Sequence, residues 1–158
     1  MHHNVTLQPI TPDDAPFLYQ VYASTRSAEM ARVPWSNAEK EAFLRFQFQA
    51  QHAFYTENFC DATFNLILLD GKRIGRLYTE RRPDEIRIID IALLPAYRGR
   101  GIGRALLEDV LRQGETAVLP VRIHVEKNNP ALRLYRRLGF SDIADKDVYL
   151  LLEWTPPT

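Results

Sequence analysis

The sequence predicts a single α/β domain: a mixed central β-sheet with helices on both faces, in the order β-α-α-β-β-β-α-β-α-β. Two observations lead to this prediction. The chain has 158 residues, which is close to the usual size of one domain. The spacing of its apolar residues changes repeatedly between helical and strand periodicity. We place the domain at residues 4–154 and regard residues 155–158 as a C-terminal tail.

Composition and charge exclude several other classes of protein. Apolar residues make up 46% of the chain, too many for a disordered protein, and Cys60 is the only cysteine, so a disulfide scaffold is excluded. No apolar run approaches the roughly 18 residues of a membrane-spanning helix. Lys plus Arg and Asp plus Glu both number 20. This zero net charge predicts no nucleic-acid partner and no membrane partner.

The first residues do not resemble a secretory signal, because no basic segment precedes an apolar one. Together with the single cysteine, this predicts a cytoplasmic protein. We assign no function to His2 and His3.

One short strand and two helices are predicted for the first third of the chain. Residues 5–8 alternate weakly and suggest the strand. Thr11, followed by a proline and two acids, is typical of a helix start. Ser36 with Glu39 is typical of a second start, the capping box. The predicted apolar faces are Phe17, Leu18, Val21 and Tyr22 in the first helix, and Phe43, Leu44, Phe46, Ala50 and Phe54 in the second.

Three strands are predicted for the middle of the chain. Residues 62–69 and 74–79 form a hairpin through the turn Asp70-Gly71. Residues 85–94 form the third strand. Its apolar residues occupy both alternation sets, so both of its faces should be covered.

The last third is predicted to alternate between helices and strands. A helix over residues 101–113 precedes a strand over residues 119–125. A second helix covers residues 130–138 and stops at Gly139. Residues 140–154 hold a final pair of strands in a hairpin-like arrangement.

A glycine-rich turn between residues 98 and 105 is the most informative segment. Three glycines alternate with three arginines where a strand ends and a helix begins: Gly99, Gly101 and Gly103 with Arg98, Arg100 and Arg104. Glycines let a ligand approach the backbone, and the unpaired N–H groups of a helix N-terminus attract anions. The pattern therefore favours a phosphate or pyrophosphate site over a tight turn with solvated arginines.

Two known phosphate-binding patterns were compared with this turn. A P-loop is excluded, because Arg104 and Ala105 follow Gly103 where a lysine and a hydroxyl residue are required. A Rossmann dinucleotide site is a rival, since Glu126 ends the next predicted strand, where the ribose-binding acid belongs. However, the Gly-x-Gly-x-x-Gly register is absent from the sequence, and too little chain follows Glu126 for such a fold.

Two motifs resemble those of the GNAT family of N-acetyltransferases. Residues 98–103 resemble the family's Gln/Arg-x-x-Gly-x-Gly/Ala acetyl-CoA motif. Residues 128–140 resemble its Asn-x-x-Ala-x-x-x-Tyr-x-x-x-Gly-Phe segment. The element order also resembles that of the family over residues 5–154. The resemblance implies a single-domain GNAT acetyltransferase fold with acetyl-CoA as co-substrate and no metal.

The resemblance also implies a cofactor site between two splayed strands. The backbone of Ile91, Ala92 and Leu93 would bind the pantetheine arm and the thioester carbonyl. The backbone amides that would hold the pyrophosphate are those of Arg98, Gly99, Arg100, Gly101, Ile102, Gly103, Arg104 and Ala105. Asn128 has the commoner spacing for the CoA-contacting asparagine. Asn129 either replaces it or caps the following helix.

Tyr135 matches the position of the family's general acid, a phenol that protonates the departing thiolate. From the residues alone, Tyr135 is instead interpreted as a core aromatic between Leu132 and Leu138.

Asp90 is the candidate general base, because its carboxylate lies among isoleucines in a predicted strand. The alternative is a structural ion pair with Arg76 or Arg87. Two further carboxylates on neighbouring predicted strands, Glu80 and Glu85, are also candidates. His124 is interpreted as a strand residue rather than a base.

The predicted activity is transfer of acetyl from acetyl-CoA to a primary amine, by direct attack in a ternary complex. The acceptor, a small molecule or a peptide, would contact residues 24–59 and 142–149, and most aromatic side chains there should be core. The first rival is a catalytically silent acyl-CoA-binding module of the same fold, and the second is the Rossmann domain. Edge strands near the C-terminus make a homodimer plausible in this family.

Overall fold

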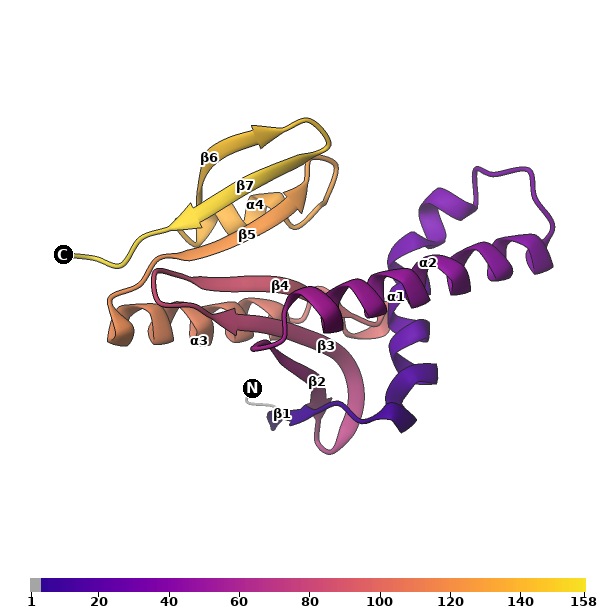
Figure 1. The fold of residues 1–158 in the computed structure, drawn as a ribbon, viewed down its shortest axis with the longest axis horizontal. Helices are drawn as coiled ribbons and strands as arrows, with labels where there is room; N and C mark the ends of the chain where they lie inside the picture. Colours follow the sequence, from indigo (N-terminus) through magenta and orange to yellow (C-terminus); the bar gives the residue numbers. More distant parts are fainter. Residues whose placement is uncertain (1–3) are drawn as a thin grey trace.

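The computed structural model describes residues 4–158, and His2 and His3 lie outside the described residues. Across residues 4–158, seven strands form one mixed sheet in the order β1-β2-β3-β4-β5-β7-β6. The elements are β1 (Val5–Pro9), η1 (Pro12–Asp14), α1 (Ala15–Met30), α2 (Asn37–Asn58), β2 (Thr63–Leu69), β3 (Lys72–Arg81), β4 (Ile86–Leu93), η2 (Pro95–Tyr97), α3 (Ile102–Ala117), β5 (Val121–Glu126), α4 (Leu132–Arg137), β6 (Ser141–Lys146) and β7 (Tyr149–Trp154). The predicted fold class is confirmed, with the final hairpin formed by β6 and β7 (Figure 1).

Several element boundaries differ from the prediction for local reasons. Helix α3 continues past residue 113 to Ala117 and ends where Val118 adopts a left-handed conformation with φ of 56°. Helix α4 begins only at Leu132, because Asn129 and the residues after it form a turn first. Both helix starts predicted from capping residues are confirmed: Thr11 heads the short η1 turn before α1, and Ser36 caps α2.

Two hydrophobic cores lie on opposite faces of the sheet (Figure 1). Helix α3 packs on one face, against β4, β5 and β7. Helices α1 and α2 pack on the other face, with the predicted apolar residues of α1 all buried.

The prediction for α2 is partly wrong. Phe46 and Phe54 are 71% and 55% exposed, whereas Leu44 and Phe48 are buried. Only the stripe that carries Leu44 and Phe48 contacts α1 and the sheet. The spacing of apolar residues in α2 fits more than one helical face, and packing selects one of them.

Strands β4 and β5 form the one parallel pair of the described sheet and separate soon after they meet. The two strands pair from Ile86 to Ile88 in β4 and from Val121 to Ile123 in β5. Beyond these residues, β4 continues to Leu93 and β5 to Glu126, and the two strands form no further pairs in the sheet. A bulge at Ile89 accompanies the separation, because β3 pairs with the residues on either side of it. The three pairs are Ile86 with Val121, Arg87 with Arg122 and Ile88 with Ile123. The expected splay is therefore confirmed.

In the described part of the chain, no helix has the length and hydropathy needed to span a bilayer.

Candidate active site

The glycine-rich turn joins the end of β4 to the start of α3. Gly99 and Gly101 adopt left-handed conformations, with φ of 73° and 82°. A Cβ atom at either position would meet no atom within 4 Å, so both glycines face open space. Helix α3 begins at Ile102, immediately after this space. Backbone N–H groups of a helix N-terminus beside two unshielded glycines fit a phosphate group.

The arginines of the turn contact the protein itself. Arg98 donates from Nε to the carbonyl oxygen of Leu93 at 2.9 Å and from Nη2 to Ser24 Oγ at 3.2 Å. It thereby links the end of β4 to α1. Arg100 lies over the ring of Tyr97, with its guanidinium carbon 5.4 Å from the ring centroid. The guanidinium groups of Arg98 and Arg100 therefore contact protein groups, whereas the backbone at Gly99 and Gly101 faces open space.

The two asparagines after β5 differ in their contacts. Asn129 Oδ1 accepts a hydrogen bond from the backbone N–H of Ala131 at 2.9 Å, so Asn129 stabilises the turn before α4. Asn129 is not the N-cap of α4, because that position is Ala131, so the capping alternative is wrong in this detail. Asn129 also borders the cavity described next. Asn128 is exposed.

A cavity of about 280 Å³ opens where β4 and β5 separate. We call it the inner cavity. It is lined by Arg26, Gln51, Phe54, Tyr55, Phe59, Arg87, Ile88, Ile89, Asp90, His124, Val125, Glu126, Asn129 and Tyr149. Its walls therefore come from α1, α2, β4, β5 and the start of β7.

Asp90 borders the inner cavity and is ion-paired. Its Oδ2 lies 2.5 Å from Nη2 of Arg76, whose side chain is only 4% exposed. Burial alone would lower the pKa of Arg76, but Asp90, Tyr78 and Tyr55 together outweigh it and the pKa is raised. Arg76 also donates to Gln51 Oε1 at 3.0 Å. The ion pair expected for Asp90 thus forms with Arg76, while Arg87 pairs with Glu85 instead.

Tyr135 is buried in the core, with its ring packed edge-on against Phe140. Burial raises the pKa of its phenol, and the negative charge of Asp90 raises it further. The interpretation of Tyr135 as a core aromatic is therefore correct. Tyr135 is not among the residues that line the inner cavity.

Glu80 and Glu85 lie in an ionic cluster away from the inner cavity. Glu80 pairs with Arg82 at 2.5 Å, and Glu85 pairs with Arg87 at 2.8 Å and with Arg122 at 3.2 Å. Neither carboxylate lines the cavity, so neither is retained as a candidate base.

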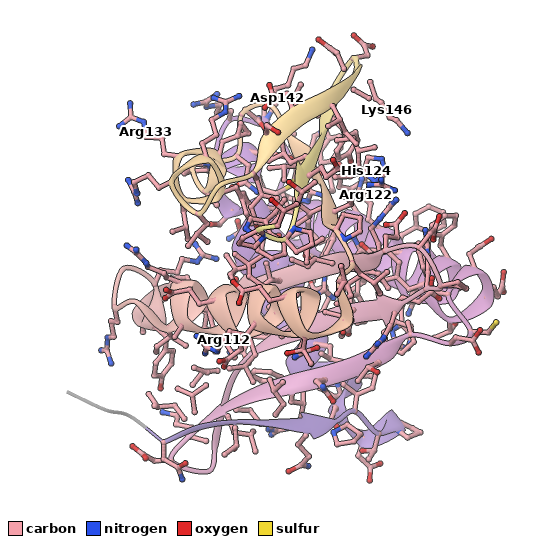
Figure 2. The ribbon with its side chains drawn as sticks, turned by 90° about the vertical axis from the view of Figure 1, so that its left-hand side faces the viewer. Arg112, Arg122, His124, Arg133, Asp142 and Lys146 are labelled. Atoms are coloured by element: carbon pink, nitrogen blue, oxygen red, sulfur yellow. The ribbon has the colours of Figure 1, made fainter. Side chains whose placement is uncertain are left out.

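His124 contacts Nη1 of Arg87 through Nδ1 at 3.2 Å. Burial and the positive charge of Arg87 lower its pKa. Figure 2 shows the side chains of Arg122 and His124 on the side of the sheet away from Arg133. His124 therefore borders the inner cavity as a neutral strand residue near neutral pH.

A second cavity of about 460 Å³ lies outside the first. We call it the outer cavity. Arg26, Glu126 and Tyr149 border both cavities. The outer cavity is lined by Arg26, Glu29, Met30, Val33, Trp35, Phe43, Gln47, Glu126, Val148 and Tyr149. All of these residues except Glu126 fall within the two segments expected on the acceptor side.

Arg26, Glu126 and Tyr149 were not predicted as site residues. The sequence assigned Glu126 only to the Rossmann rival. The available signal for Glu126 was its place at the end of the strand that carries His124. Residues two apart in a strand point to the same face of the sheet, so Glu126 and His124 share a face. No local pattern distinguishes Arg26 from other helix arginines.

Among residues 4–158, no group of three or more His, Cys, Asp and Glu side chains could hold a metal ion.

Comparison with known proteins identifies the family. The model of the Acetyltransferase (GNAT) family matches residues 21–140. The chain belongs to this family. The Rossmann alternative is wrong, because β4 and β5 are the one parallel pair of the described sheet and the glycine turn belongs to a GNAT fold.

Curated relatives of this GNAT protein include N-acetyltransferases. The chain is 26% identical over 140 residues to the [ribosomal protein bS18]-alanine N-acetyltransferase of Escherichia coli, covering 87% of this chain and 81% of that protein. It is 39% identical over 71 residues to the N-alpha-acetyltransferase RimI of Mycobacterium tuberculosis, covering 45% of this chain and 42% of that protein. The matches to several relatives thus span about half of their length or less.

Solved structures share the fold. The PaiA N-acetyltransferase of Thermoplasma acidophilum, solved in complex with coenzyme A, superposes with a TM-score of 0.71 at 18% identity, covering 96% of this chain and 99% of that one. The Escherichia coli ribosomal-protein-S18-alanine N-acetyltransferase gives a TM-score of 0.67 at 21% identity, covering 98% and 95%.

Proposed function

We propose that this GNAT protein is an acetyl-CoA-dependent N-acetyltransferase that acts by direct attack of a primary amine in a ternary complex. One observation carries the proposal. The separated ends of β4 and β5 flank a cavity that Asp90 borders, and the glycine turn with its open space follows directly from the end of β4. We further propose that the protein is cytoplasmic and forms a homodimer through its edge strand β6.

The separated strand end fits the linear part of the cofactor. Backbone groups of Ile91, Ala92 and Leu93 on the side toward β5 have no strand partner in the described sheet. Apart from the Leu93 carbonyl oxygen, which accepts a hydrogen bond from Arg98, they are available to bond a pantetheine arm. A backbone N–H there would also stabilise the oxyanion that develops on the thioester carbonyl, a contribution worth about 3 kcal/mol. The residues of the turn, from Arg98 to Ala105, would hold the pyrophosphate, and Asn128 or Asn129 would contact the cofactor from the segment between β5 and α4.

Acetyl-CoA supplies the acetyl thioester. In the proposed step the amine nitrogen forms a bond to the acetyl carbon, the carbon–sulfur bond breaks, and Tyr135 donates its phenolic proton to the sulfur that leaves. The raised pKa of Tyr135 keeps this proton in place until the thiolate forms.

The amine must lose a proton before or during its attack. We propose Asp90 as the residue that takes it, since its carboxylate borders the inner cavity. Arg76 fixes the orientation of this carboxylate, and 25% of the Asp90 side chain is exposed. Replacing Asp90 by asparagine should keep the shape of the side chain and remove the proton acceptor, which should lower kcat by about 10²- to 10⁴-fold.

The acceptor class is proposed from the relatives. Two of them are named for acetylation of an α-amine or of an alanine of a ribosomal protein. We therefore propose the α-amine of a peptide or protein N-terminus as the first acceptor class to test, with small primary amines as the second. Both classes fit a site whose outer part lies on the surface between α1, α2 and β7.

A two-stage experiment tests the proposal. Acetyl-CoA, with NADP in parallel, is titrated while the melting temperature is recorded, and release of free CoA is then followed with a panel of peptides and amines. We expect stabilisation by acetyl-CoA alone and release of CoA with at least one amine. Tyr135→Phe should lower kcat and leave the acetyl-CoA affinity unchanged. Binding of acetyl-CoA without transfer to any amine would support the silent module instead.

A further inference from the structure

One ion pair separates the inner and outer cavities. Nη1 of Arg26 lies 3.2 Å from Oε1 of Glu126 and 3.3 Å from Oε1 of Glu29. Arg26 belongs to α1, and Glu126 is the last residue of β5. Their contact crosses from the helical layer to the β5–β7–β6 part of the sheet, and both residues border both cavities.

The outer cavity has an apolar wall and an excess of negative charge. Trp35 packs edge-on against Phe43, with ring centroids 5.2 Å apart, and Val148 faces them from the β6–β7 turn. Glu29 and Glu126 provide two carboxylates against the single cation Arg26 among its lining residues. Such a cavity complements a molecule that carries one positive charge and one apolar group.

Arg26 can leave Glu126 without losing all of its partners. Glu29 remains beside the guanidinium, which also lies 5.5 Å from the ring centroid of Tyr22. Its Nε is buried and makes no hydrogen bond to the residues that the structure describes. Glu126, in turn, keeps a cation when an ammonium group replaces Arg26, so no unpaired carboxylate is left in a partly buried position.

We propose that Glu126 receives the ammonium group of the acceptor in exchange for Arg26, and that the acceptor carries an aromatic or branched apolar group that fills the outer cavity. This inference rests on the proposed acetyl transfer. Glu126 then positions the amine between the outer cavity and the separated end of β4, and Arg26 opposes acceptors that lack the charge to displace it. The apolar wall of the outer cavity then selects among the amines that have displaced Arg26.

The test uses opposite effects of two substitutions on the full chain with saturating acetyl-CoA. Glu126→Gln removes the charge that binds the ammonium and should raise the acceptor KM by roughly 10-fold or more. Arg26→Gln removes the competing cation and should lower the acceptor KM by about two- to fivefold. A purely structural ion pair predicts that both variants melt at lower temperature and change the KM in the same direction.

Matched acceptors test the apolar group. Ethylamine and 2-phenylethylamine form one pair, and the peptide amides Ala-Gly and Ala-Phe form the other, so that small amines and peptide N-termini are distinguished. We expect the aromatic member of at least one pair to have the lower KM, and Trp35→Ala to reduce that difference. Glu41→Gln, which breaks an exposed Arg45–Glu41 pair on α2, serves as the control and should change nothing.

The outcomes separate the inference from the proposed function. If CoA is released but Glu126→Gln and Arg26→Gln leave the acceptor KM unchanged or shift it the same way, the exchange is refuted while acetyl transfer stands. Equal KM values for both members of each pair refute the apolar selection. If no amine yields free CoA although acetyl-CoA still stabilises the protein, acetyl transfer and the exchange are both refuted.

Discussion

Replacing Gly101 by alanine tests the glycine turn as a phosphate site. Gly101 has φ of 82°, and a Cβ atom there would meet no atom within 4 Å. The cost to folding is therefore conformational strain alone, about 1–2 kcal/mol for a residue with a side chain in the left-handed region. For a domain of this size, that lowers the melting temperature by about 2–8 °C. The new methyl group would project into the space proposed for the pyrophosphate.

Gly71 provides a matched control. It has φ of 81°, and its Cβ would likewise meet nothing within 4 Å, but it lies in the turn between β2 and β3. Gly71→Ala should thus lower the melting temperature as much as Gly101→Ala does. The two variants should differ only in their response to the cofactor.

The assay is the increase in melting temperature caused by acetyl-CoA. At about 100 times its dissociation constant a ligand adds about 2.7 kcal/mol, which corresponds to about 5–11 °C here. We expect Gly71→Ala to keep this increase and Gly101→Ala to lose most of it. The reasoning is refuted if Gly101→Ala keeps the full increase, or if Gly71→Ala loses it.

Three further predictions concern pH dependence and stability. Because burial and Asp90 raise the pKa of Tyr135, kcat should not fall between about pH 8 and pH 10, and a pH–rate profile that declines there would contradict its role. Burial alone would raise the pKa of Glu85, but its arginine partners lower it below the ordinary 4.5. Glu85→Gln should therefore lower the free energy of unfolding by about 3–5 kcal/mol at pH 7 and by less near pH 3. The reason is that the stability contributed by Glu85 is present above its unfolded pKa and is lost as the pH falls through its folded pKa. Equal losses in denaturant titrations at both pH values would contradict this prediction. Leu44→Ala should lower the free energy of unfolding by about 2–5 kcal/mol, because Leu44 is buried, whereas Phe46→Ala should change it by no more than about 0.5 kcal/mol, because Phe46 is exposed. Similar losses for the two variants in calorimetry would show that α2 packs through a different face.

Local signals predicted most of the fold. Two of these signals depend only on residues close in sequence: the capping box of Ser36 and Glu39, and the Asp70-Gly71 turn. Both features are present in the structure as expected. The exposed Phe46 was not predicted, because which stripe of α2 is buried depends on how α2 crosses α1. That crossing is a tertiary property that helical spacing does not contain.

The candidate site divides in the same way. The glycine turn and Tyr135 belong to contiguous motifs, so sequence alone could locate them. Arg26 and Glu126 are 100 residues apart, and neither lies in a motif of its own. Their meeting depends on the position of α1 above the end of β5, which follows from the sheet order and not from any local pattern.

The short seam between β4 and β5 has a consequence for the order in which substrates bind. Three residue pairs join the two parts of the sheet, and α3 supports both from beneath. A cofactor seated between the separated ends would contact both parts and hold them at a fixed spacing. The acceptor cavities take one wall from each part, so their shape depends on that spacing. Under the proposed function, we therefore expect acetyl-CoA to bind first and the amine to enter a site that the cofactor has completed.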